Sequence, residues 1–581
     1  MKPLQVPAIF AFILLHLIVC TQNAYSQVHS PKYEVRAVWI ATVMGLDWPK
    51  STDPVEQERI LREIVRNVYE ANFNTIYFQV RGRADAMYRS GFEPWSHVLT
   101  GVLGQDPGFD PLQCVIDEAH KYGMEVHAWF NTFLVKSGGP LPEVSEPKHV
   151  LLTHPEWIRQ VNGEWWFDPG IPEVRMYNIK VALDIIKHYN LDGFQLDFIR
   201  YPGKNFPDDQ SYQSYGESMR RDDWRRENIN LFISTLYDSA KAIKPFLKIG
   251  ATPMGIYKNF NGVRGQSSYD ELYQDSHLWL QKGFVDYVVP QVYWTLGDQK
   301  GDPDFALVAH NWSDNTKSRH VYLGIAAYKS DVSEQIPLII DTTRALNLKG
   351  NAFFRYTHIK QLKNFDGRYD HKALVPPMPW KDSIPPLPPY YVDVQNITDG
   401  IFKIQWKEAQ PVTPDDSAEQ FLIYRSPHAP IDITNPDNLI ARVAKGKNEY
   451  IDTIFHISST HYIYAVTAID ALNNESFPAN ESIILPEIVE IAKKWEYKFH
   501  LGMVIKSSSS VVHIPYEVDE NGPVIIKILD GMNREVKNVV DKIQPPGRYV
   551  VSTDMSSLGD GKYTCLLLTR NKSERKVFWV D

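Results

Sequence analysis

The sequence predicts an α/β protein in which a (β/α)8 TIM barrel over residues 31–375 is followed by two all-β sandwich domains. Residues 33–375 alternate between apolar strand-like segments and amphipathic helix-like segments, whereas the sequence beyond residue 385 consists of short β-rich runs. The two parts are separated by a stretch so rich in proline that neither a helix nor a central strand can persist in it. We therefore place a linker at residues 376–391.

Length and composition fit a multidomain globular protein. At about 100 to 200 residues per domain, the 581 residues correspond to several domains, and 43% apolar with 23% charged residues is ordinary for folded proteins. Acidic residues outnumber basic ones, 70 to 61, and no long basic block is present. The sequence therefore predicts no nucleic-acid partner.

Residues 1–26 have the pattern of a secretory signal peptide. Lys2 precedes a short apolar run, and the small-residue segment Ala24–Ser26 precedes Gln27. The run is too short for a secure membrane span, so we expect export to the periplasm, cell surface or medium, with no membrane span after cleavage. An uncleaved anchor and lipid attachment at Cys20 are the alternatives, and Val19 is a poor residue before a lipidated cysteine.

Eight apolar segments are the expected barrel strands, and several are apolar on both faces, as buried parallel strands must be. Helix signals lie between them: Asp110 suits an N-cap, Pro111 the first turn and Gly123 the C-terminal cap. An open doubly wound sheet is the alternative, but no glycine-rich dinucleotide fingerprint follows the first strand. The expected strands are residues 35–42, 75–81, 124–131, 193–201, 247–253, 286–294, 321–328 and 350–357.

The two C-terminal segments have separate signatures. Residues 392–486 resemble a fibronectin type III sandwich, with Trp406 in an alternating strand and residues 461–470 similar to the strand that carries the tyrosine corner. Residues 487–581 resemble the FlgD-type immunoglobulin-like module of exported bacterial proteins. We expect both to be spacers or attachment units, since such folds host many unrelated roles.

Polar residues late in the predicted strands mark the candidate site, because barrel active sites form where the strands end. Alternation of side chains along a strand places several of these residues on common faces that a barrel could point inward. The sets are Gln79 with Arg81, His127 with Trp129 and Asn131, Gln195 with Asp197, and Gln291 with Tyr293.

A run of ordered motifs adds a family resemblance over residues 31–375. The motifs are EVRAVWIAT, FQVRGRADAMYRSGFEPWS, GFDPLQCVIDEAHKYGMEVHAWFN, FDPGIPEVR, LDGFQLDFIRYPG and VVPQVYW. In this order they resemble the bacterial glycosyl hydrolase-like ten family. The resemblance implies a barrel that acts on a glycan, with peptidoglycan strands stripped of their peptides as one such substrate.

Glycosidic cleavage usually needs two carboxyl groups, one to protonate the leaving oxygen and one to activate water or stabilise the sugar cation. Asp197 is the first candidate and most simply the general acid, because apolar neighbours would raise its pKa. Its alternative role is a salt bridge to Arg200 or Arg81. Asp85, which matches an acidic position of the family's strand-two motif, is the second candidate, and its alternative is to cap a turn. Asp47 and Asp168 are the reserves.

The strand-four motif also resembles that of the chitinase superfamily. Asp192, Gly193 and Asp197 match, but Gln195 and Ile199 replace an aspartate and the glutamate that would protonate the leaving group. Standard chitinase chemistry is therefore not expected. Gln291 and Tyr293 fall where that superfamily places substrate contacts.

Sugar binding calls for aromatic faces and polar tips. We expect about half of six aromatic residues to line a cleft, and Arg81 and Arg200 either to hold a substrate carboxylate or to pair with Asp85 or Asp197. The six aromatic candidates are Trp129, Trp165, Trp166, Trp294, Tyr328 and Tyr356. The predicted substrate-binding residues are Gln79, Arg81, Trp129, Asn131, Trp165, Trp166, Gln195, Arg200, Gln291, Tyr293 and Trp294.

No metal or other cofactor is predicted, with a structural calcium left open. Only three cysteines occur, His127 is expected in the core, and no His, Asp and Glu set has metal-ligand spacing. The sequence thus favours an exported bacterial glycoside hydrolase acting on a polysaccharide. The alternative is a carbohydrate-binding or scaffold protein on the same barrel; a deacetylase would need metal ligands. Oligomeric state and glycan linkage stay open.

Overall fold

The computed structural model describes residues 30–580, apart from several short internal segments. Those segments are residues 139–144, 217–218, 298–300, 318, 361–364, 399, 412–416, 455–461, 480–481, 485–497, 503 and 507–510. The predicted signal peptide and Cys20 lie outside the described residues.

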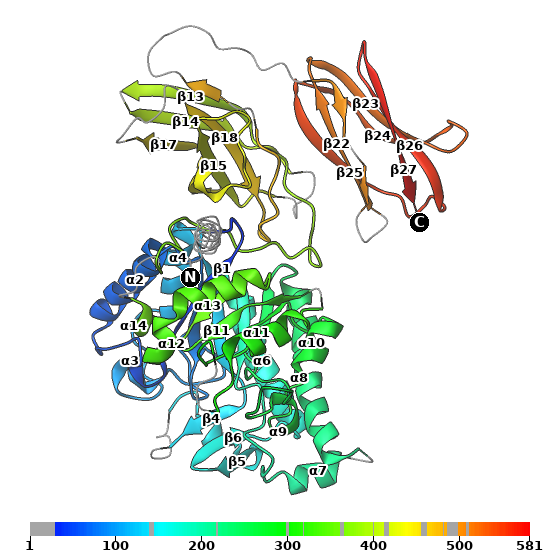
Figure 1. Cartoon of the computed structure of the whole chain (residues 1–581). Coiled ribbons are helices and arrows are strands. Elements are labelled where there is room, and N and C mark those ends of the chain that lie inside the picture. Colours follow the sequence, from blue (N-terminus) through cyan, green and yellow to red (C-terminus); the bar gives the residue numbers. More distant parts are fainter. Residues whose placement is uncertain are drawn as a thin grey trace, which may run out of the picture.

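The first part of the chain is an α/β barrel built on one parallel sheet (Figure 1). The strands follow the order β10-β9-β8-β7-β3-β2-β1-β12-β11. Their bounds are β1 Val35–Ile40, β2 Thr75–Arg81, β3 Glu125–Asn131, β7 Gly193–Asp197, β8 Lys248–Ala251, β9 Tyr287–Val288, β10 His320–Val321, β11 Leu323–Ile325 and β12 Gly350–Phe353.

The two end strands of this order are pieces of one segment. β10 pairs with β9 and β11 pairs with β12, with only Tyr322 between the two pieces. The segment predicted at residues 321–328 therefore changes partner within its length and closes the sheet. The predicted α/β barrel is confirmed, and each of the eight predicted strand segments contains at least part of a strand.

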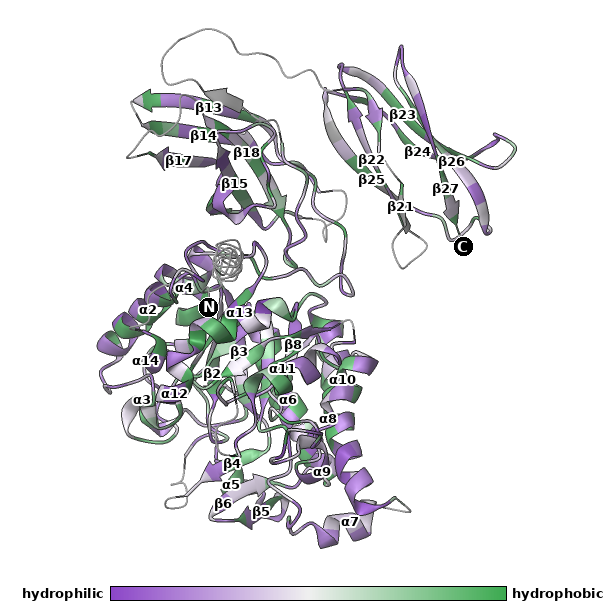
Figure 2. Cartoon of the chain, in the orientation of Figure 1, coloured by the Kyte–Doolittle hydropathy of each residue, from purple (hydrophilic) through white to green (hydrophobic). Residues whose placement is uncertain are grey.

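Amphipathic helices cover the outside of the sheet. α2 and α4 begin at prolines after Asp53 and Asp110, whose side chains accept hydrogen bonds from backbone N–H groups of the first turn. Figure 2 shows apolar strands inside and a largely polar α8 outside. The helices are η1 Val43–Gly45, α2 Pro54–Glu70, α3 His97–Thr100, α4 Pro111–Lys121, α5 Val150–Thr153, η2 Pro155–Trp157, α6 Pro172–His188, α7 Asp209–Tyr215, α8 Arg221–Ile243, α9 Ser268–Glu271, α10 Ser276–Lys282, α11 Phe305–Ser313, α12 Ser330–Glu334, α13 Ile336–Ala345 and α14 Tyr356–Ile359.

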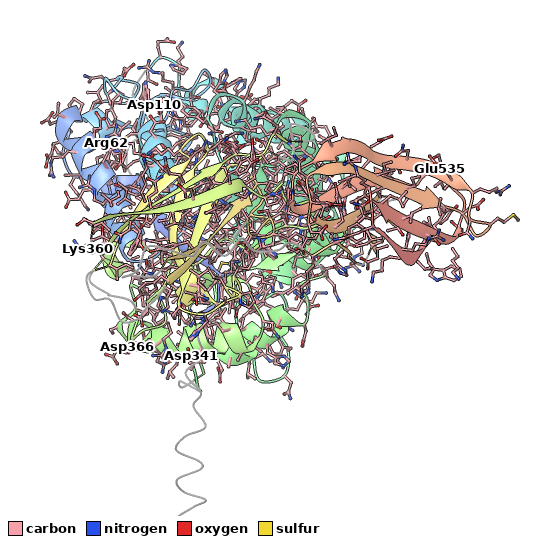
Figure 3. The ribbon with its side chains drawn as sticks, turned by 90° about the horizontal axis from the view of Figure 1, so that it is seen from above. Arg62, Asp110, Asp341, Lys360, Asp366 and Glu535 are labelled. Carbon is pink, nitrogen blue, oxygen red and sulfur yellow. The ribbon has the colours of Figure 1, made fainter. Side chains whose placement is uncertain are left out.

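Ion pairs fix neighbouring helices to each other. Arg62 of α2 pairs with Glu118 of α4 at 3.0 Å. Seen from above in Figure 3, Arg62 and Asp110 lie at the edge of the molecule, in the helical layer. This layer is the expected outer ring of a barrel.

A small antiparallel sheet, which we call the insertion sheet, follows β3. It has the order β4-β6-β5, with β4 Leu134–Ser137, β5 Ile158–Val161 and β6 Glu164–Phe167. Because β3 leads directly into it, the insertion sheet lies at the carboxyl end of the barrel strands (Figure 1). No strand was predicted between residues 131 and 193.

The opposite, amino end of the barrel is covered by the linker and the middle module, which spans residues 390–484. Trp380 Nε1 donates to Asp286 Oδ1 at 2.9 Å, and Lys381 pairs with Asp286 Oδ2 at 3.1 Å. Leu374 packs in one buried cluster with residues of the middle module. Lys32 forms a buried ion pair with Glu475 of that module.

Two pairs of antiparallel sheets make up the rest of the chain. The middle module pairs the sheet β13-β14-β17 with β16-β15-β18-β19, and the C-terminal module pairs β20-β22-β21, joined by β25, with β24-β23-β26-β27. The strands are β13 Tyr390–Thr398, β14 Ile401–Lys407, β15 Gln420–Ser426, β16 Leu439–Ala444, β17 Glu449–Thr453, β18 Tyr462–Ile469, β19 Ser482–Ile484, β20 His500–Leu501, β21 Ile505–Lys506, β22 Val511–Val518, β23 Gly522–Leu529, β24 Glu535–Gln544, β25 Gly547–Asp554, β26 Gly561–Leu568 and β27 Ser573–Val580; η4 is Pro436–Asn438. Among the helices that the structure describes, none combines the length and apolar character needed to cross a membrane.

Candidate active site

The carboxyl ends of β3 and β7 bring several predicted site residues together. The parallel register sets Trp129 beside Gln195 and Asn131 beside Asp197. All four side chains are buried. Since residues two apart on a strand share a face, these four form two adjacent rows at the top of the barrel.

Asp197 ends β7 in a buried position, where its carboxyl group is hydrogen-bonded to neighbouring groups. Its Oδ2 accepts a hydrogen bond from Trp129 Nε1 at 3.1 Å, and its Oδ1 accepts one from the Phe198 backbone at 2.7 Å. Burial raises the pKa of this carboxyl group, partly offset by the charge of Arg200. In the described part of the chain Asp197 makes no ion pair with Arg200 or Arg81. A carboxyl group with a raised pKa at a strand end suits a general acid.

Arg81 is buried and bonded to protein groups, which corrects its predicted role as a ligand of the substrate. It is fully buried, its guanidinium pairs with Glu93, and its Nη1 also donates to the Asn131 and Thr132 carbonyls and to Asn178 Oδ1. Its partner is therefore neither Asp85 nor Asp197. With no exposed surface, it offers nothing to a substrate carboxylate.

Arg200 is half-buried and keeps an unused donor. Its guanidinium lies over the Phe198 ring at 4.5 Å, and its buried Nη1 has no acceptor among the described residues. Burial lowers the pKa of Arg200, and the charges of Asp197, Glu164 and Tyr293 work against that effect. This unused donor beside Asp197 could bind a carboxylate or hydroxyl of a ligand.

The proposed second carboxylates are all engaged with protein groups. Asp85 Oδ1 accepts the Arg83 N–H at 2.8 Å, a contact with the preceding loop and not a cap of a following turn. Asp47 accepts hydrogen bonds from Ala41, Arg355 and Thr357, and Asp168 accepts from Ser211 and Gly170 and pairs with Arg159. Asp85 remains a prediction, while Asp47 and Asp168 have structural partners.

Several polar atoms at this end of the barrel lack a protein partner. Gln195 Oε1 accepts from Trp39 Nε1 at 2.7 Å, which leaves the buried Nε2 without an acceptor. Asn131 donates to the Gly82 carbonyl, but its buried Oδ1 has no donor, and neither has Thr252 Oγ1. Buried polar atoms usually find partners, so these atoms mark a place where a ligand or water completes the bonding.

The other two predicted glutamines differ. Gln79 is buried, and its Oε1 accepts the Thr42 and Val43 N–H groups, so it holds the turn after β1. Gln291 is half-buried, and its backbone bridges Met254 and Gly324.

The six aromatic candidates divide evenly. Trp129, Trp166 and Tyr356 are buried and expose little ring surface. Trp165 and Trp294 are half-buried and Tyr328 is 46% exposed. Tyr293 lies beside Tyr328, with ring centroids 6.2 Å apart. The exposed members could stack on a sugar ring.

His127 is a core histidine, as expected. Its Nδ1 lies 2.6 Å from the Tyr287 hydroxyl and its Nε2 lies 3.1 Å from Glu125. The described residues include no cluster of His, Cys, Asp and Glu that could hold a metal ion. A hollow lined by Tyr391, Trp406 and Lys407 belongs to the middle module and contains none of the predicted site residues.

Two acidic residues near the site were not predicted. Glu93 pairs with Arg81, and Glu164 contributes to the electrostatic environment of Arg200. The buried Arg81 required a nearby counter-charge, and that requirement was the signal for Glu93. Glu164 follows Asn162 and Gly163, a pair that favours a turn, and no pattern in the sequence marked it as a site residue.

The fold and this site define a class: a TIM-barrel glycoside hydrolase, with a protonatable carboxyl group and open hydrogen-bonding atoms at the carboxyl ends of its strands. The chain belongs to the glycosyl hydrolase-like 10 family, whose model matches residues 34–342. The predicted family resemblance is confirmed.

Known relatives carry the same class name. The chain is 34% identical over 479 residues to "Glycosyl hydrolase YngK" of Bacillus subtilis (strain 168), covering 76% of this chain and 92% of that protein. It is 34% identical over 324 residues to "Glycosyl hydrolase DigH" of Escherichia coli (strain K12), covering 51% and 73%. Among solved structures, the PgaB (BpsB) glycoside hydrolase domain from Bordetella bronchiseptica matches with a TM-score of 0.43 at 11% identity, covering 59% of this chain and 99% of that one.

Proposed function

We propose that this protein is an exported glycoside hydrolase that cleaves O-glycosidic bonds in peptide-free peptidoglycan glycan strands. The observation that carries the proposal is Asp197, a buried carboxyl group with a raised pKa at a strand end, beside an arginine with an unused donor. Asp197 would protonate the oxygen of the leaving sugar, the step that glycosidic cleavage needs most.

The unpartnered Nη1 of Arg200 supports an acidic glycan as substrate. Muramic acid without its peptide ends in a lactyl carboxylate, and arginine binds carboxylates with paired N–H groups. Gln195, Asn131, Gln291 and Tyr293 would hold the sugar hydroxyl and acetamido groups, and Trp165, Trp294 and Tyr328 would stack on its rings.

Product analysis tests the proposal. The purified protein is incubated with peptide-free glycan strands, intact peptidoglycan and chitin oligomers, and the products are measured by mass spectrometry. Shorter glycans that gain one water per cut, and that disappear in D197N, are the expected result. Binding without any shortened product would favour a carbohydrate-binding protein on the same barrel.

Export has its own test. Expression of the full chain in a bacterial host with a periplasm, followed by fractionation and N-terminal sequencing, should give a mature protein that begins at Gln27. A protein retained in the cytoplasm with Met1 intact would contradict export, and a lipid on Cys20 would replace cleavage after Ser26.

A further inference from the structure

A hydrolase with Asp197 as its acid lacks a second carboxylate on the strands. The described strands β8 to β12 end without an acidic residue, and Asp47 and Asp168 are paired with arginines. Asp85 lies in the loop after β2, where its Oδ1 accepts the Arg83 N–H. A second carboxylate must then reach the site from outside the barrel sheet. The insertion sheet lies at the carboxyl end of the barrel strands, the same end as Asp197.

Glu164 lies on the face of the insertion sheet that is turned toward β7. It is the first residue of β6 and shares a face with Trp166, two positions later. The Trp166 ring packs against Phe198, with centroids 5.8 Å apart, and Phe198 directly follows Asp197. The opposite face carries Trp165, with Lys136 Nζ 5.9 Å from its ring.

One oxygen of Glu164 is fixed and the other is open. Glu164 Oε2 accepts a hydrogen bond from Trp166 Nε1 at 3.0 Å, whereas Oε1 accepts none within the described structure. Arg200, stacked on Phe198, lies within the electrostatic reach of both Asp197 and Glu164. The half-buried Glu164 and the buried Asp197 thus both contribute to the electrostatic environment of one guanidinium from different elements.

We propose that Glu164 is the second catalytic carboxylate, opposite Asp197 at this site; the inference rests on the proposed hydrolase function. Glu164 Oε1 accepts a proton from a water molecule, whose oxygen forms a bond to the anomeric carbon. The glycosidic C–O bond breaks, and its electron pair stays on the leaving oxygen, which takes the proton of Asp197. One water is consumed, and the two carboxyl groups exchange protonation states until solvent restores them.

E164Q separates this role from a structural one. Glutamine can still accept the hydrogen bond of Trp166 Nε1, but it cannot take a proton from water. We expect kcat on peptide-free glycan strands to fall by about 100-fold or more, with the melting temperature and the tryptophan near-UV spectrum unchanged. E156Q, an exposed glutamate of the same insertion paired with His154, is the matched control and should retain wild-type kcat.

A nitrophenyl glycoside of the cleaved sugar distinguishes base from acid. Such a leaving group needs little protonation, so D197N should recover much of its activity on it, while E164Q should not because water still needs a base. The acidic limb of the kcat/KM profile should also disappear in E164Q.

The inference is overturned if E164Q keeps wild-type kcat on both substrates, or if D85N and not E164Q removes activity. Absence of hydrolysis by the wild-type protein on all glycans would instead contradict the proposed function itself. The wild-type and E164Q measurements therefore tell the two failures apart.

Discussion

The two ends of the barrel differ in whether their buried polar groups have hydrogen-bond or ion-pair partners. At the amino end, Glu125 accepts hydrogen bonds from Lys248 and from Asn473 of the middle module and lies beside His127. At the carboxyl end, Gln195 Nε2 and Arg200 Nη1 are buried without an acceptor. The charged groups named at the amino end have partners within the chain, whereas these two donors at the carboxyl end have none among the described residues.

This difference indicates that the amino end contributes to stability and the carboxyl end to function. A buried polar atom without a partner costs about 1 to 3 kcal/mol, so the carboxyl end is costly to keep unless a ligand or water uses it. The amino end has the opposite character, because the linker and the middle module satisfy its charges. Substitutions at the two ends should therefore have different effects.

The largest expected effect is on catalysis at the carboxyl end. D197N should lower kcat on peptide-free glycan strands by about two to four orders of magnitude, because asparagine cannot donate the proton. Wild-type kcat/KM should fall as pH rises through the raised pKa of Asp197, which must be protonated to act. A pH series of initial rates for both proteins measures this, and wild-type turnover in D197N would contradict it.

The same substitution should not weaken the fold. Asp197 has a higher pKa in the folded than in the unfolded state, so the native protein binds more protons and its stability falls as pH rises between the two values. Because asparagine does not titrate, D197N does not show this decrease in stability with rising pH. Asparagine has one acceptor oxygen and so gives up one of the two hydrogen bonds from Trp129 and Phe198, which offsets this gain. At pH 7 the unfolding midpoint of D197N in urea should stay close to that of the wild type, and a loss of more than about 3 kcal/mol would show that Asp197 is structural.

The next effect is on stability at the amino end. E475A leaves the buried Lys32 without its partner and removes the acceptor of Tyr33 and Tyr424. Breaking a buried pair costs about 3 kcal/mol or more, measured as the free energy of unfolding in urea, while kcat of the folded protein should stay unchanged. E419A, which removes an exposed pair with Lys445, is the control and should cost less than about 1 kcal/mol.

N473G tests the contact between the middle module and the barrel interior, because Asn473 has a positive φ of 62° that glycine tolerates and alanine does not. It removes the 3.2 Å hydrogen bond to Glu125, which keeps Lys248 and His127 as neighbours. The expected loss is about 1 to 3 kcal/mol of unfolding free energy, with kcat unchanged. No loss of stability would mean that the module does not complete this end of the barrel.

The smallest effect should come from the C-terminal module. A chain ending at residue 486 keeps the barrel, the linker and the middle module, whose core is a separate cluster from that of the C-terminal module. Its kcat on peptide-free glycan strands should match that of the full chain. Loss of folding on this truncation would give the C-terminal module an integral role.

Much of the fold could be predicted because its signals are local. The apolar runs at β1, β2 and β3 and the Asp-Pro starts of α2 and α4 each depend on neighbouring residues alone. The insertion sheet was not predicted, since its strands of four residues are partly exposed and lack a long apolar run. Segment 286–294 shortened to β9 because Pro290 has no N–H for the ladder.

Strand geometry could be predicted at the candidate site, but the side-chain pairs around it could not. Strand alternation placed Gln195 and Asp197 on one inward row, because that geometry is fixed by the strand itself. The partner of Arg81 is Glu93, 12 residues away through an irregular loop, and the contact of Trp166 with Phe198 joins two elements. Neither contact has a sequence period that could reveal it.

A crystal structure of D197N with a bound peptide-free glycan fragment tests the central claim most directly. We predict a glycosidic oxygen within hydrogen-bond distance of the residue 197 side chain, with Arg200, Gln195 and Asn131 in contact with the sugar. A fragment bound elsewhere, with position 197 shut away from it, would contradict the assignment.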